Sequence, residues 1–355
     1  MAGLDRSERL VIVGTLAATL IAGLLTYAHA HAVAAFAATA VALAMQAYLV
    51  GQATEQLGTR LGPGATGVLQ SALGNLPELF VGIFALRDGL ITVVQAAIVG
   101  SILGNNLLVL GLAFLVGGLR HGTQRFASEP PRIIATLMLL AVSALAVPTL
   151  AQGLHTPAAA HEEALGVACA LVLLAVFVAS IPLSVSGSPA SVPGPGAESV
   201  TADWPIWLAT AVLAAAGVGA AFVSEWFVGS LRPAIASLRL SEAFTGLVVV
   251  AIAGNAVENV VGIQLAAQNK PDYAVSVILN SPLQVALALT PILVLLSFYI
   301  GPTPLTLVLP PLLVAALALG TLVTTVIIFD GESIWLEGVA LIGLYGIIAA
   351  SFWWG

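Results

Sequence analysis

Two glutamates lie in matching surroundings in the two halves of this chain. Glu78 belongs to Gly-Asn-Leu-Pro-Glu-Leu-Phe-Val-Gly-Ile at 74–83, and Glu258 belongs to Gly-Asn-Ala-Val-Glu-Asn-Val-Val-Gly-Ile at 254–263. Each copy lies inside an apolar segment long enough to cross a bilayer. A carboxylate in the middle of such a segment costs roughly 3 kcal/mol and usually serves a function. Because repeated segments of transporters often meet at one midplane site, the pair predicts a single cation site between the two halves.

The neighbours of each glutamate add further oxygen ligands. Asn75 and Glu78 are three positions apart, so they share one face of a helix. Asn255 and Glu258 have the same spacing in the second copy. Two such faces turned toward each other bring together two carboxylates and two amide oxygens. This set suits a hard cation such as Ca²⁺, which prefers several oxygen ligands, including carboxylates and backbone carbonyls.

Helix breaks near the glutamates would expose backbone carbonyls to the cation. Pro77 lacks a backbone N–H and disfavours a continuous helix through Gly74 and Asn75. The run Asn-Ser-Pro at 280–282 predicts a similar break in the second half. Irregular backbone at membrane depth is tolerated where it lines a cavity, so both breaks are expected to border the site.

The same two carboxylates can also bind protons. A carboxyl group in a desolvated site holds its proton more readily than in water, and two that share a site titrate as a unit. Protons and a metal cation would therefore exclude each other at Glu78 and Glu258. Exclusive occupancy combined with alternating access is antiport.

Other polar residues at membrane depth are candidates for the ion pathway. Asn105 and Gln284 would line the path or bridge neighbouring helices. Ser101 and Ser281, at matching positions of the two copies, would contact the ion or serve only as small packing residues.

Composition places these motifs in a membrane protein. Of the 355 residues, 59% are hydrophobic and only 8% are charged, and the mean hydropathy is +1.07. The single cysteine, Cys169, excludes a disulfide framework. The sequence contains no phosphate-binding loop and no His-Glu-x-x-His motif, which argues against an ATP-driven pump and an intramembrane protease. We expect a transporter rather than an enzyme, whose partners are the lipid bilayer, the cation and protons, with no cofactor and no nucleic acid.

Hydropathy predicts an all-α fold with eleven membrane spans. They lie at 10–28, 32–57, 65–87, 91–117, 132–152, 163–184, 204–230, 242–268, 272–300, 303–329 and 334–354. The stretch 185–203, rich in Pro, Gly and Ser, predicts a flexible connector. The expected division is a leading helix at 1–30, a first repeat at 31–184, this connector, and a second repeat at 204–355. The first segment would alternatively be a signal peptide cleaved after 28–30, but its apolar run is longer than a usual signal core.

The two halves are expected to be inverted with respect to each other. Glu78 and Ser101 are 23 residues apart in sequence number, as are Glu258 and Ser281. An odd number of helices separates the two copies, which gives them opposite orientations in the membrane.

The basic residues predict a cytoplasmic N-terminus. Seven then fall inside and three outside, which fits the positive-inside rule. The inner set is Arg6, Arg9, Arg60, Arg120, Arg125, Arg132 and Lys270, and the outer set is Arg87, Arg232 and Arg239. Glu55 and Glu225, near opposite faces, would attract cations to the two mouths or stand as solvated helix ends. The short termini favour a prokaryotic cell membrane.

Several motifs together resemble the calcium/proton exchanger family of the cation/calcium exchanger superfamily. They are Ala-Thr-Glu-Gln-Leu (53–57), Gly-Asn-Leu-Pro-Glu-Leu (74–79), Val-Gln-Ala (94–96), Gly-Ser-Ile-Leu-Gly-Asn (100–105), Gly-Thr-Gln-Arg-Phe (122–126), Gly-Asn-Ala-Val-Glu (254–258), Ser-Pro-Leu-Gln (281–284) and Asp-Gly-Glu-Ser-Ile-Trp-Leu-Glu-Gly (330–338). The resemblance implies one leading helix and two inverted five-helix halves. It also implies that Glu78 and Glu258 bind metal and protons, and that Gln95 and Gln284 belong to the pathway. The expected metal ligands are Glu78, Glu258, Asn75 and Asn255, with carbonyls near Gly74 and Gly254.

Three departures from the family pattern concern ion preference and pH dependence. The family usually has His after the second glutamate, where this chain has Asn259. Leu76 and Pro77 stand where Ala-Thr is common, and Pro-Glu-Leu is similar to the sodium/calcium branch. The connector carries only Glu198 and Asp203, whereas an acidic stretch is frequent there.

The leading hypothesis is a secondary antiporter that exchanges Ca²⁺, or a related cation, for H⁺. The alternatives are a Na⁺/H⁺ or Na⁺/Ca²⁺ exchanger that uses the same two glutamates, and an ion channel. Inverted repeats around a closed midplane site favour alternation over a continuous pore. The oligomeric state is left open.

Overall fold

Helices make up almost all of the regular structure. The computed structural model describes residues 5–61, 73–185 and 204–354. Its α-helices are α1 (Arg6–Tyr27), α2 (Ala32–Leu61), α4 (Leu76–Arg87), α5 (Ile91–Leu103), α6 (Leu110–His121), α7 (Glu129–Gly153), α8 (Glu162–Val185), α9 (Ile206–Leu238), α10 (Glu242–Phe244), α11 (Ala251–Gly254), α12 (Ala256–Ala267), α13 (Pro271–Gln284), α14 (Thr290–Ile300), α15 (Pro311–Ile327) and α16 (Trp335–Ser351). Three π-helices, η1 (Gly104–Val109), η3 (Thr245–Val250) and η4 (Val285–Leu289), and a 3₁₀ turn, η2 (Pro157–His161), connect them. The short strands β1 (Gln124–Arg125) and β2 (Glu332–Ser333) form the one sheet among the described residues. Because every other regular element there is a helix, the all-α prediction is confirmed.

Seven helical stretches in the described part of the chain are long and apolar enough to cross a bilayer. They become eight if the bent pair Glu242–Gly254 and Asn259–Ala267 forms one span, and α15 and α16 are shorter apolar helices. The span predicted at 303–329 becomes helical only at Pro311, because the preceding prolines lack the N–H groups that a helix needs. The span predicted at 65–87 lies partly outside the described residues, and the connector predicted at 185–203 lies almost wholly outside them.

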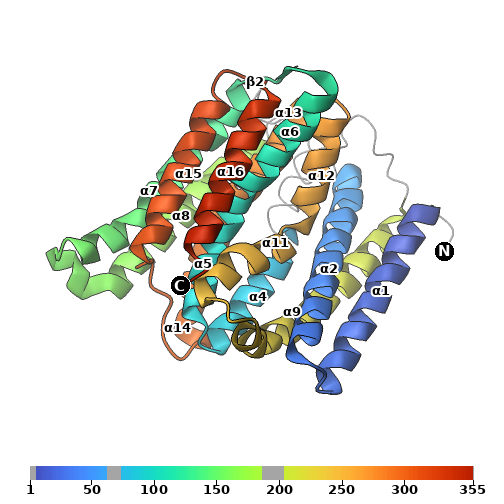
Figure 1. Ribbon diagram of the computed structural model, residues 1–355, viewed down its shortest axis with the longest axis horizontal. Coiled ribbons are helices and arrows are strands. Elements are labelled where there is room, and N and C mark those ends of the chain that lie inside the picture. Colours follow the sequence, from blue (N-terminus) through green and yellow to red (C-terminus); the bar gives the residue numbers. More distant parts are fainter. Residues whose placement is uncertain (1–4, 62–72, 186–203, 355) are drawn as a thin grey trace.

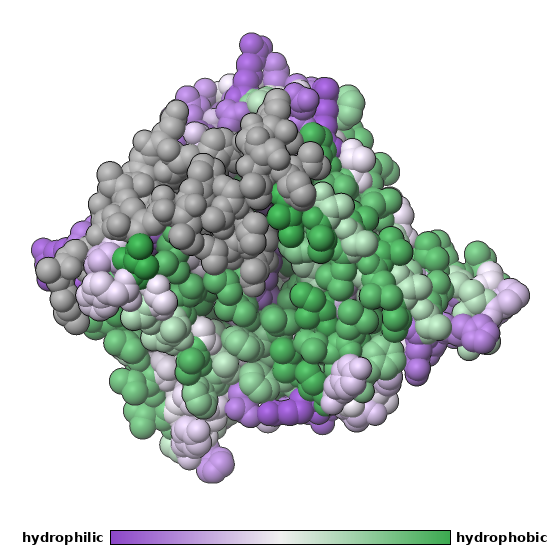
Figure 2. Space-filling view, turned by 180° about the vertical axis from the view of Figure 1, so that it is seen from behind, coloured by the Kyte–Doolittle hydropathy of each residue, from purple (hydrophilic) through white to green (hydrophobic). Residues whose placement is uncertain are grey.

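The surface is mainly apolar, as the composition predicts. Figure 2 shows hydrophobic residues over most of one face, with hydrophilic residues gathered toward its edges. On α1, Leu10, Leu20 and Leu24 are 66%, 67% and 69% exposed. Exposing such side chains to water is unfavourable, whereas lipid accepts them. The structure therefore supports a multi-pass membrane protein.

Two long, bent stretches run through the centre of the molecule. One consists of α5, η1 and α6, and the other of α13, η4 and α14, and both are mostly buried. Helices α1, α2 and α9 lie together on one side of them, and α7, α8 and α15 lie on the other side (Figure 1). Gly100 on α5 and Gly246 on η3 have no side chains, which lets these two backbones touch. The central stretches are thus held close to the broken helix of the second half.

The helix is broken at both Gly-Asn motifs. In the first motif, a turn at Gly74 and Asn75 precedes α4, as predicted. Pro77 lies in the first turn of α4, where its missing N–H costs little because that position has no intrahelical acceptor. In the second motif, α11 ends at Gly254, α12 begins at Ala256, and the two arms are bent by 63°.

The break predicted at 280–282 is wrong. Helix α13 continues through these residues with Pro282 inside it, and η4 follows directly. Asn280 Nδ2 donates to the carbonyl of Ser276 at 2.8 Å. A membrane helix tolerates an internal proline where its surroundings or a local change of winding satisfy the backbone group that the proline frees, so Pro282 does not end α13.

Polar contacts close the two ends of the helix bundle. At the end that carries the strands, Arg125 Nε lies 3.0 Å from Glu332 Oε1, and Arg132 Nη2 donates at 2.7 Å to a carbonyl just before β2. At the end where α4 meets α5, Arg232 Nη2 donates to the carbonyl of Asp88 at 3.0 Å. Arg125 and Arg132 therefore lie at one end and Arg232 at the other, which is the grouping that the predicted topology requires.

Candidate cation-binding site

Glu78 meets the second motif at the point where its helix is broken. It lies in the first turn of α4, immediately after the turn at Gly74 and Asn75. A Cβ atom built on Gly254 would lie 2.9 Å from Glu78 Cγ and 3.1 Å from its Oε1. The absence of a side chain at Gly254 therefore makes room for the carboxylate. A helix N-terminus also favours negative charge, so both the space and the local electrostatics suit an anionic Glu78.

Asn255 connects three helical segments beside this carboxylate. Its Oδ1 accepts hydrogen bonds from Asn105 Nδ2 at 2.8 Å and from the hydroxyls of Ser101 and Ser281 at 3.1 and 3.2 Å. Its Nδ2 donates to the carbonyl of Ala251 at 2.8 Å and to Ser101 Oγ at 2.9 Å. Asn255 is 3% exposed and Asn105 is 1% exposed. This buried cluster brings α5, η1, α11 and α13 to one point.

A second amide contact joins the two halves. Asn75 Nδ2 donates to Gln284 Oε1 at 3.1 Å, although the two residues are 209 positions apart. Asn105 Oδ1 is buried and has no hydrogen-bond partner among the described residues. Such an oxygen can accept a hydrogen bond from water or coordinate a cation. The site thus combines amide, hydroxyl and carboxylate oxygens.

A small cavity of about 30 Å³ borders the cluster. Glu78, Ser101, Gly254 and Asn255 form its polar end. From there the cavity follows α4 to Ala85 and α5 to Val93, toward the end of the bundle that carries Asp88, and these walls are apolar. The volume is sufficient for one or two water-sized species. The described site therefore has room for a bare or partly hydrated ion next to Glu78.

Glu258 has the same place in its helix as Glu78. It lies in the first turn of α12, after the break at Asn255, just as Glu78 follows the turn at Asn75. The side chain of Glu258 is outside the described part of the structure, so convergence of the two carboxylates stays a prediction. Within the described part, no three His, Cys, Asp or Glu side chains come together. There the site offers one carboxylate, together with amide and hydroxyl oxygens.

Two of the expected pathway residues, Gln95 and Glu225, contact groups outside this cluster. Gln95 Nε2 donates to the carbonyls of Thr306 and Val308 at 3.2 and 3.0 Å, which ties α5 to the extended segment before α15. Glu225 Oε1 lies 2.9 Å from Arg87 Nη1 at an exposed end of the bundle. Glu55 is partly buried on α2.

The contacts across the halves were not anticipated residue by residue. Sequence reasoning grouped each asparagine with its own glutamate, whereas the structure places Glu78 against Gly254 and Ser101 against Asn255. The Gly-Asn pair in both motifs carried a usable signal. A glycine directly before a helix break leaves space for a side chain from another helix. The asparagine that follows the glycine can donate and accept hydrogen bonds with polar residues of neighbouring helices.

The chain is similar to cation exchangers along most of its length. It matches the family described as "Sodium/calcium exchanger protein" over residues 31–185 and 208–354. It is 36% identical over 339 residues to a "Ca(2+)/H(+) antiporter" of Synechocystis sp., covering 89% of this chain and 90% of the relative. It is 34% identical to the "Ca(2+)/H(+) antiporter ChaA" of Bacillus subtilis, covering 94% and 95%. The solved "Structure of native YfkE" aligns with a TM-score of 0.82 at 31% identity, covering 97% of this chain and 99% of that one.

Proposed function

This chain belongs to the calcium/proton exchanger family of the cation/calcium exchanger superfamily, and we propose that it moves Ca²⁺ across a membrane in exchange for H⁺. The observation that carries this proposal is the contact between Glu78 and Gly254 beside the buried Asn255 cluster. A partly buried carboxylate next to neutral oxygens can bind either a hard cation or a proton, and the two compete for the same atoms. Competition of this kind couples the two fluxes in opposite directions.

We assign the metal ligands to both motifs. They are Glu78, Glu258, Asn75 and Asn255, with the backbone carbonyls near Gly74 and Gly254. Glu78 and Glu258 also carry the exchanged protons. In the described arrangement Asn255 Oδ1 already accepts three hydrogen bonds. Binding Ca²⁺ through this oxygen requires those donors to turn away, so occupancy of the site changes the contacts among α5, η1 and α13.

We also propose the inverted-repeat architecture with its expected boundaries. A leading helix at 1–30 precedes one repeat at 31–184, and a connector at 185–203 leads to a second repeat at 204–355, which together give eleven spans. The two family matches, at 31–185 and 208–354, support this division. The directions of the helices that carry the glutamates support the inversion. Helix α4 runs from the site to Arg87, whereas α12 runs toward Asn269, which accepts a hydrogen bond from Gln124 on β1.

The proposed orientation places the N-terminus in the cytoplasm of a prokaryotic cell. Arg125 and Arg132 lie at the strand end of the bundle, which is the cytoplasmic end under the positive-inside rule. The cavity beside Glu78 then extends toward the outer face. Bacterial relatives fit a cell-membrane location.

Ion exchange in everted membrane vesicles tests the function. Vesicles that contain the wild-type chain are expected to accumulate Ca²⁺ when a pH gradient is imposed, acid inside. Glu78→Gln and Glu258→Gln are each expected to abolish uptake, because the amide carries no charge to bind either ion. Glu163→Gln, an exposed residue at the start of α8, serves as the matched control. Normal uptake by either site variant would contradict the assignment.

The sodium-coupled alternatives use the same site. Pro77-Glu78-Leu79 is similar to the sodium/calcium branch, and Asn259 replaces the usual histidine. Parallel assays with Na⁺, K⁺ and Mn²⁺ distinguish them. If a Na⁺ gradient drives Ca²⁺ uptake without a pH gradient, the function is Na⁺/Ca²⁺ exchange rather than Ca²⁺/H⁺ exchange.

A further inference from the structure

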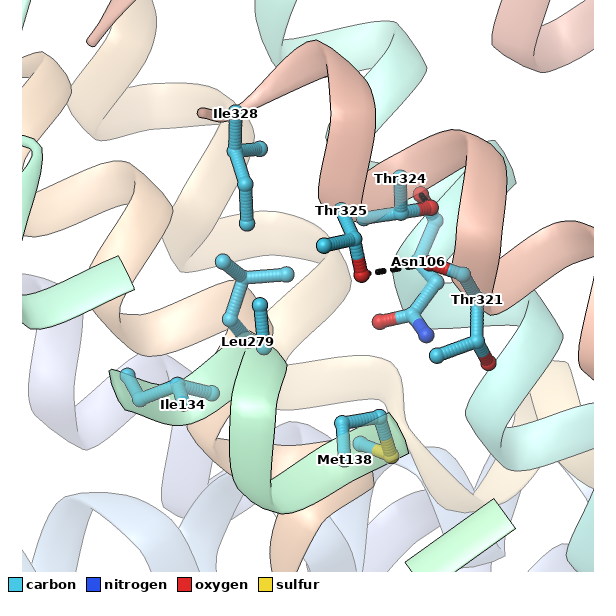
Figure 3. A pocket seen from close by; sticks show the side chains of 9 residues that line it. Asn106, Ile134, Met138, Leu279, Thr321, Thr324, Thr325 and Ile328 are labelled. Carbon is cyan, nitrogen blue, oxygen red and sulfur yellow. Dashed lines mark hydrogen bonds between the residues drawn. The ribbon is translucent and has the colours of Figure 1, made fainter. Parts of the chain in front are cut away.

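A second small pocket, mostly apolar but with one polar wall, is lined by the residue that follows Asn105 of the candidate site. It is enclosed by η1, α7, α13 and α15 and has a volume of about 10 Å³ (Figure 3). That volume corresponds to about one water molecule. Its polar wall consists of Asn106, Thr321, Thr324 and Thr325, and its other walls are aliphatic side chains and a methionine.

Two buried oxygens of this pocket lack hydrogen-bond partners. Asn106 Oδ1 and Thr321 Oγ1 accept no hydrogen bond from any described residue, and the two residues are 2% and 1% exposed. The neighbouring hydroxyls are already used. Thr324 Oγ1 donates to the carbonyl of Asn106 at 3.1 Å, and Thr325 Oγ1 donates to the carbonyl of Thr321 at 2.8 Å. Leaving a buried amide oxygen and a buried hydroxyl without partners is unfavourable, so the two groups require a species that donates to Asn106 Oδ1 and accepts the proton of the Thr321 hydroxyl.

Charge and shape decide which species fits. The pocket lining contains no carboxylate, and Ile134, Met138 and Leu279 form much of its wall. A cation would lose its hydration there without gaining a counter-charge. A water molecule has the right size and can both donate to the amide oxygen and accept from the hydroxyl.

The place of Asn106 in its helix links this pocket to the site. Asn105 and Asn106 are consecutive residues of the π-helix η1. Asn105 directs its amide to Asn255, whereas Asn106 lines the second pocket. In the π-helix η4, Ala286 follows Ser281 by five residues, as Asn106 follows Ser101, and it is fully buried. A π-helix in this position therefore does not by itself need an amide side chain.

We propose that this pocket binds one water molecule, which donates to Asn106 Oδ1 and accepts from the Thr321 hydroxyl. The bound water joins η1 to α15 and so holds η1 in the register that directs Asn105 at Asn255. Asn106 and Thr321 are thus positioning residues for the cation site, and this role rests on the proposed function.

A double-mutant cycle on thermal unfolding of the full chain in detergent tests the water bridge. Asn106→Leu and Thr321→Val remove the amide and the hydroxyl with little change in shape. Each single variant is expected to lower the Tm, and the double variant is expected to lower it by clearly less than both shifts added, because either change already breaks the bridge. Thr325→Val, in the same pocket but bonded within its own helix, should combine additively with Asn106→Leu. Additive shifts for the Asn106 and Thr321 pair would overturn the bridge.

Two further measurements separate the remaining outcomes. The first compares the Tm of the wild type in NaCl or KCl with that in choline chloride. A higher Tm in NaCl or KCl that is lost in Thr321→Val would show that the pocket binds a monovalent cation instead of water, and would overturn the proposal.

The second measurement concerns the positioning role. Thr321→Val is expected to raise the apparent KM for Ca²⁺ about tenfold, which is the scale of outer-shell changes at metal sites. Thr321→Ser keeps the hydroxyl and should have the wild-type KM. An unchanged KM alongside a coupled Tm cycle would overturn that role. The unfolding cycle needs no transport, so it remains informative if the chain carries no Ca²⁺ at all.

Discussion

The carboxylate of Glu78 occupies the space that a side chain at residue 254 would fill. The two residues are 176 positions apart, and the built Cβ of Gly254 would lie only 2.9 Å from Glu78 Cγ. One half of the chain therefore supplies the acid, and the other half supplies the space and the helix break that receive it. This arrangement makes the site dependent on the packing of the two halves against each other.

Gly254→Ala is expected to weaken Ca²⁺ binding, because the new methyl group displaces the Glu78 side chain. A displacement of this kind should raise the apparent KM for Ca²⁺ by about 10- to 100-fold, as other changes that reorient a metal ligand do. Uptake in everted vesicles at graded Ca²⁺ concentrations measures it. Gly343→Ala on α16 is the matched control, since a Cβ there meets no atom within 4 Å. Equal KM values for the two variants would mean that Glu78 does not use this space in the working protein.

Asn255→Ala is expected to destabilise the protein as well as to reduce transport. It removes the acceptor of three buried hydrogen bonds and leaves Asn105 Nδ2 without its shortest contact. Leaving such donors buried costs about 1–3 kcal/mol, which a lower Tm in detergent should report. Asn280→Ala removes an amide that bonds only within its own helix and should have a smaller effect. A Tm unchanged by Asn255→Ala would show that water replaces the lost acceptor.

The ion pair between Arg87 and Glu225 is expected to affect transport rate more than stability. It joins α4 to α9, but both side chains are nearly half exposed, at 47% and 43%. Exposed pairs contribute about 0–1 kcal/mol, so Arg87→Ala should barely change the Tm. If α4 and α9 separate during the transport cycle, the same change should alter the maximal rate of uptake. The charge-swapped pair Arg87→Glu with Glu225→Arg should restore the wild-type rate, and a failure of this rescue would argue against a role for the pair.

Asn259→His is expected to make Ca²⁺ uptake more sensitive to acid. Asn259 follows Glu258, and its Nδ2 donates weakly to the carbonyl of Ile252 across the helix break, at 3.4 Å. Histidine gains a positive charge as the pH falls through about 6.5. That charge repels Ca²⁺, so the affinity should decrease below this pH and match the wild type above it. Asn259→Gln controls for size, and identical pH profiles for both variants would contradict the expectation.

The first helix is expected to remain part of the mature protein. Trp204 Nε1 donates to Glu8 Oε1 at 2.8 Å, and the ring of Trp226 packs edge-on against Tyr27. Cleavage after 28–30 would remove both contacts and expose Trp204, which is fully buried. N-terminal sequencing of the purified protein should therefore show a start that lies before Glu8. A mature start near His31 would refute the helix.

Much of the architecture follows from local patterns in the sequence. Long apolar runs predict where helices lie, since each run can satisfy its backbone only within itself in lipid. The paired Gly-Asn-x-x-Glu motifs indicate the site, because a charged residue at that depth is too costly to be incidental. Pro77 marks the first helix break correctly, since its position relative to Gly74 and Asn75 is a local property.

Tertiary structure decided the features that depend on distant residues or on helix phase. Asn-Ser-Pro at 280–282 reads like Pro77 locally, yet α13 continues through it, because contacts with the surroundings of a helix can satisfy the backbone group that a proline frees. Gln95 faces the segment before α15 rather than the site, since one residue of helix turns a side chain by about 100°. In η1, the consecutive residues Asn105 and Asn106 face different partners, Asn255 and the second pocket. The sequence by itself determined which residues are too costly to bury without a purpose, whereas packing between the halves determined which of them meet, because those contacts join residues more than a hundred positions apart.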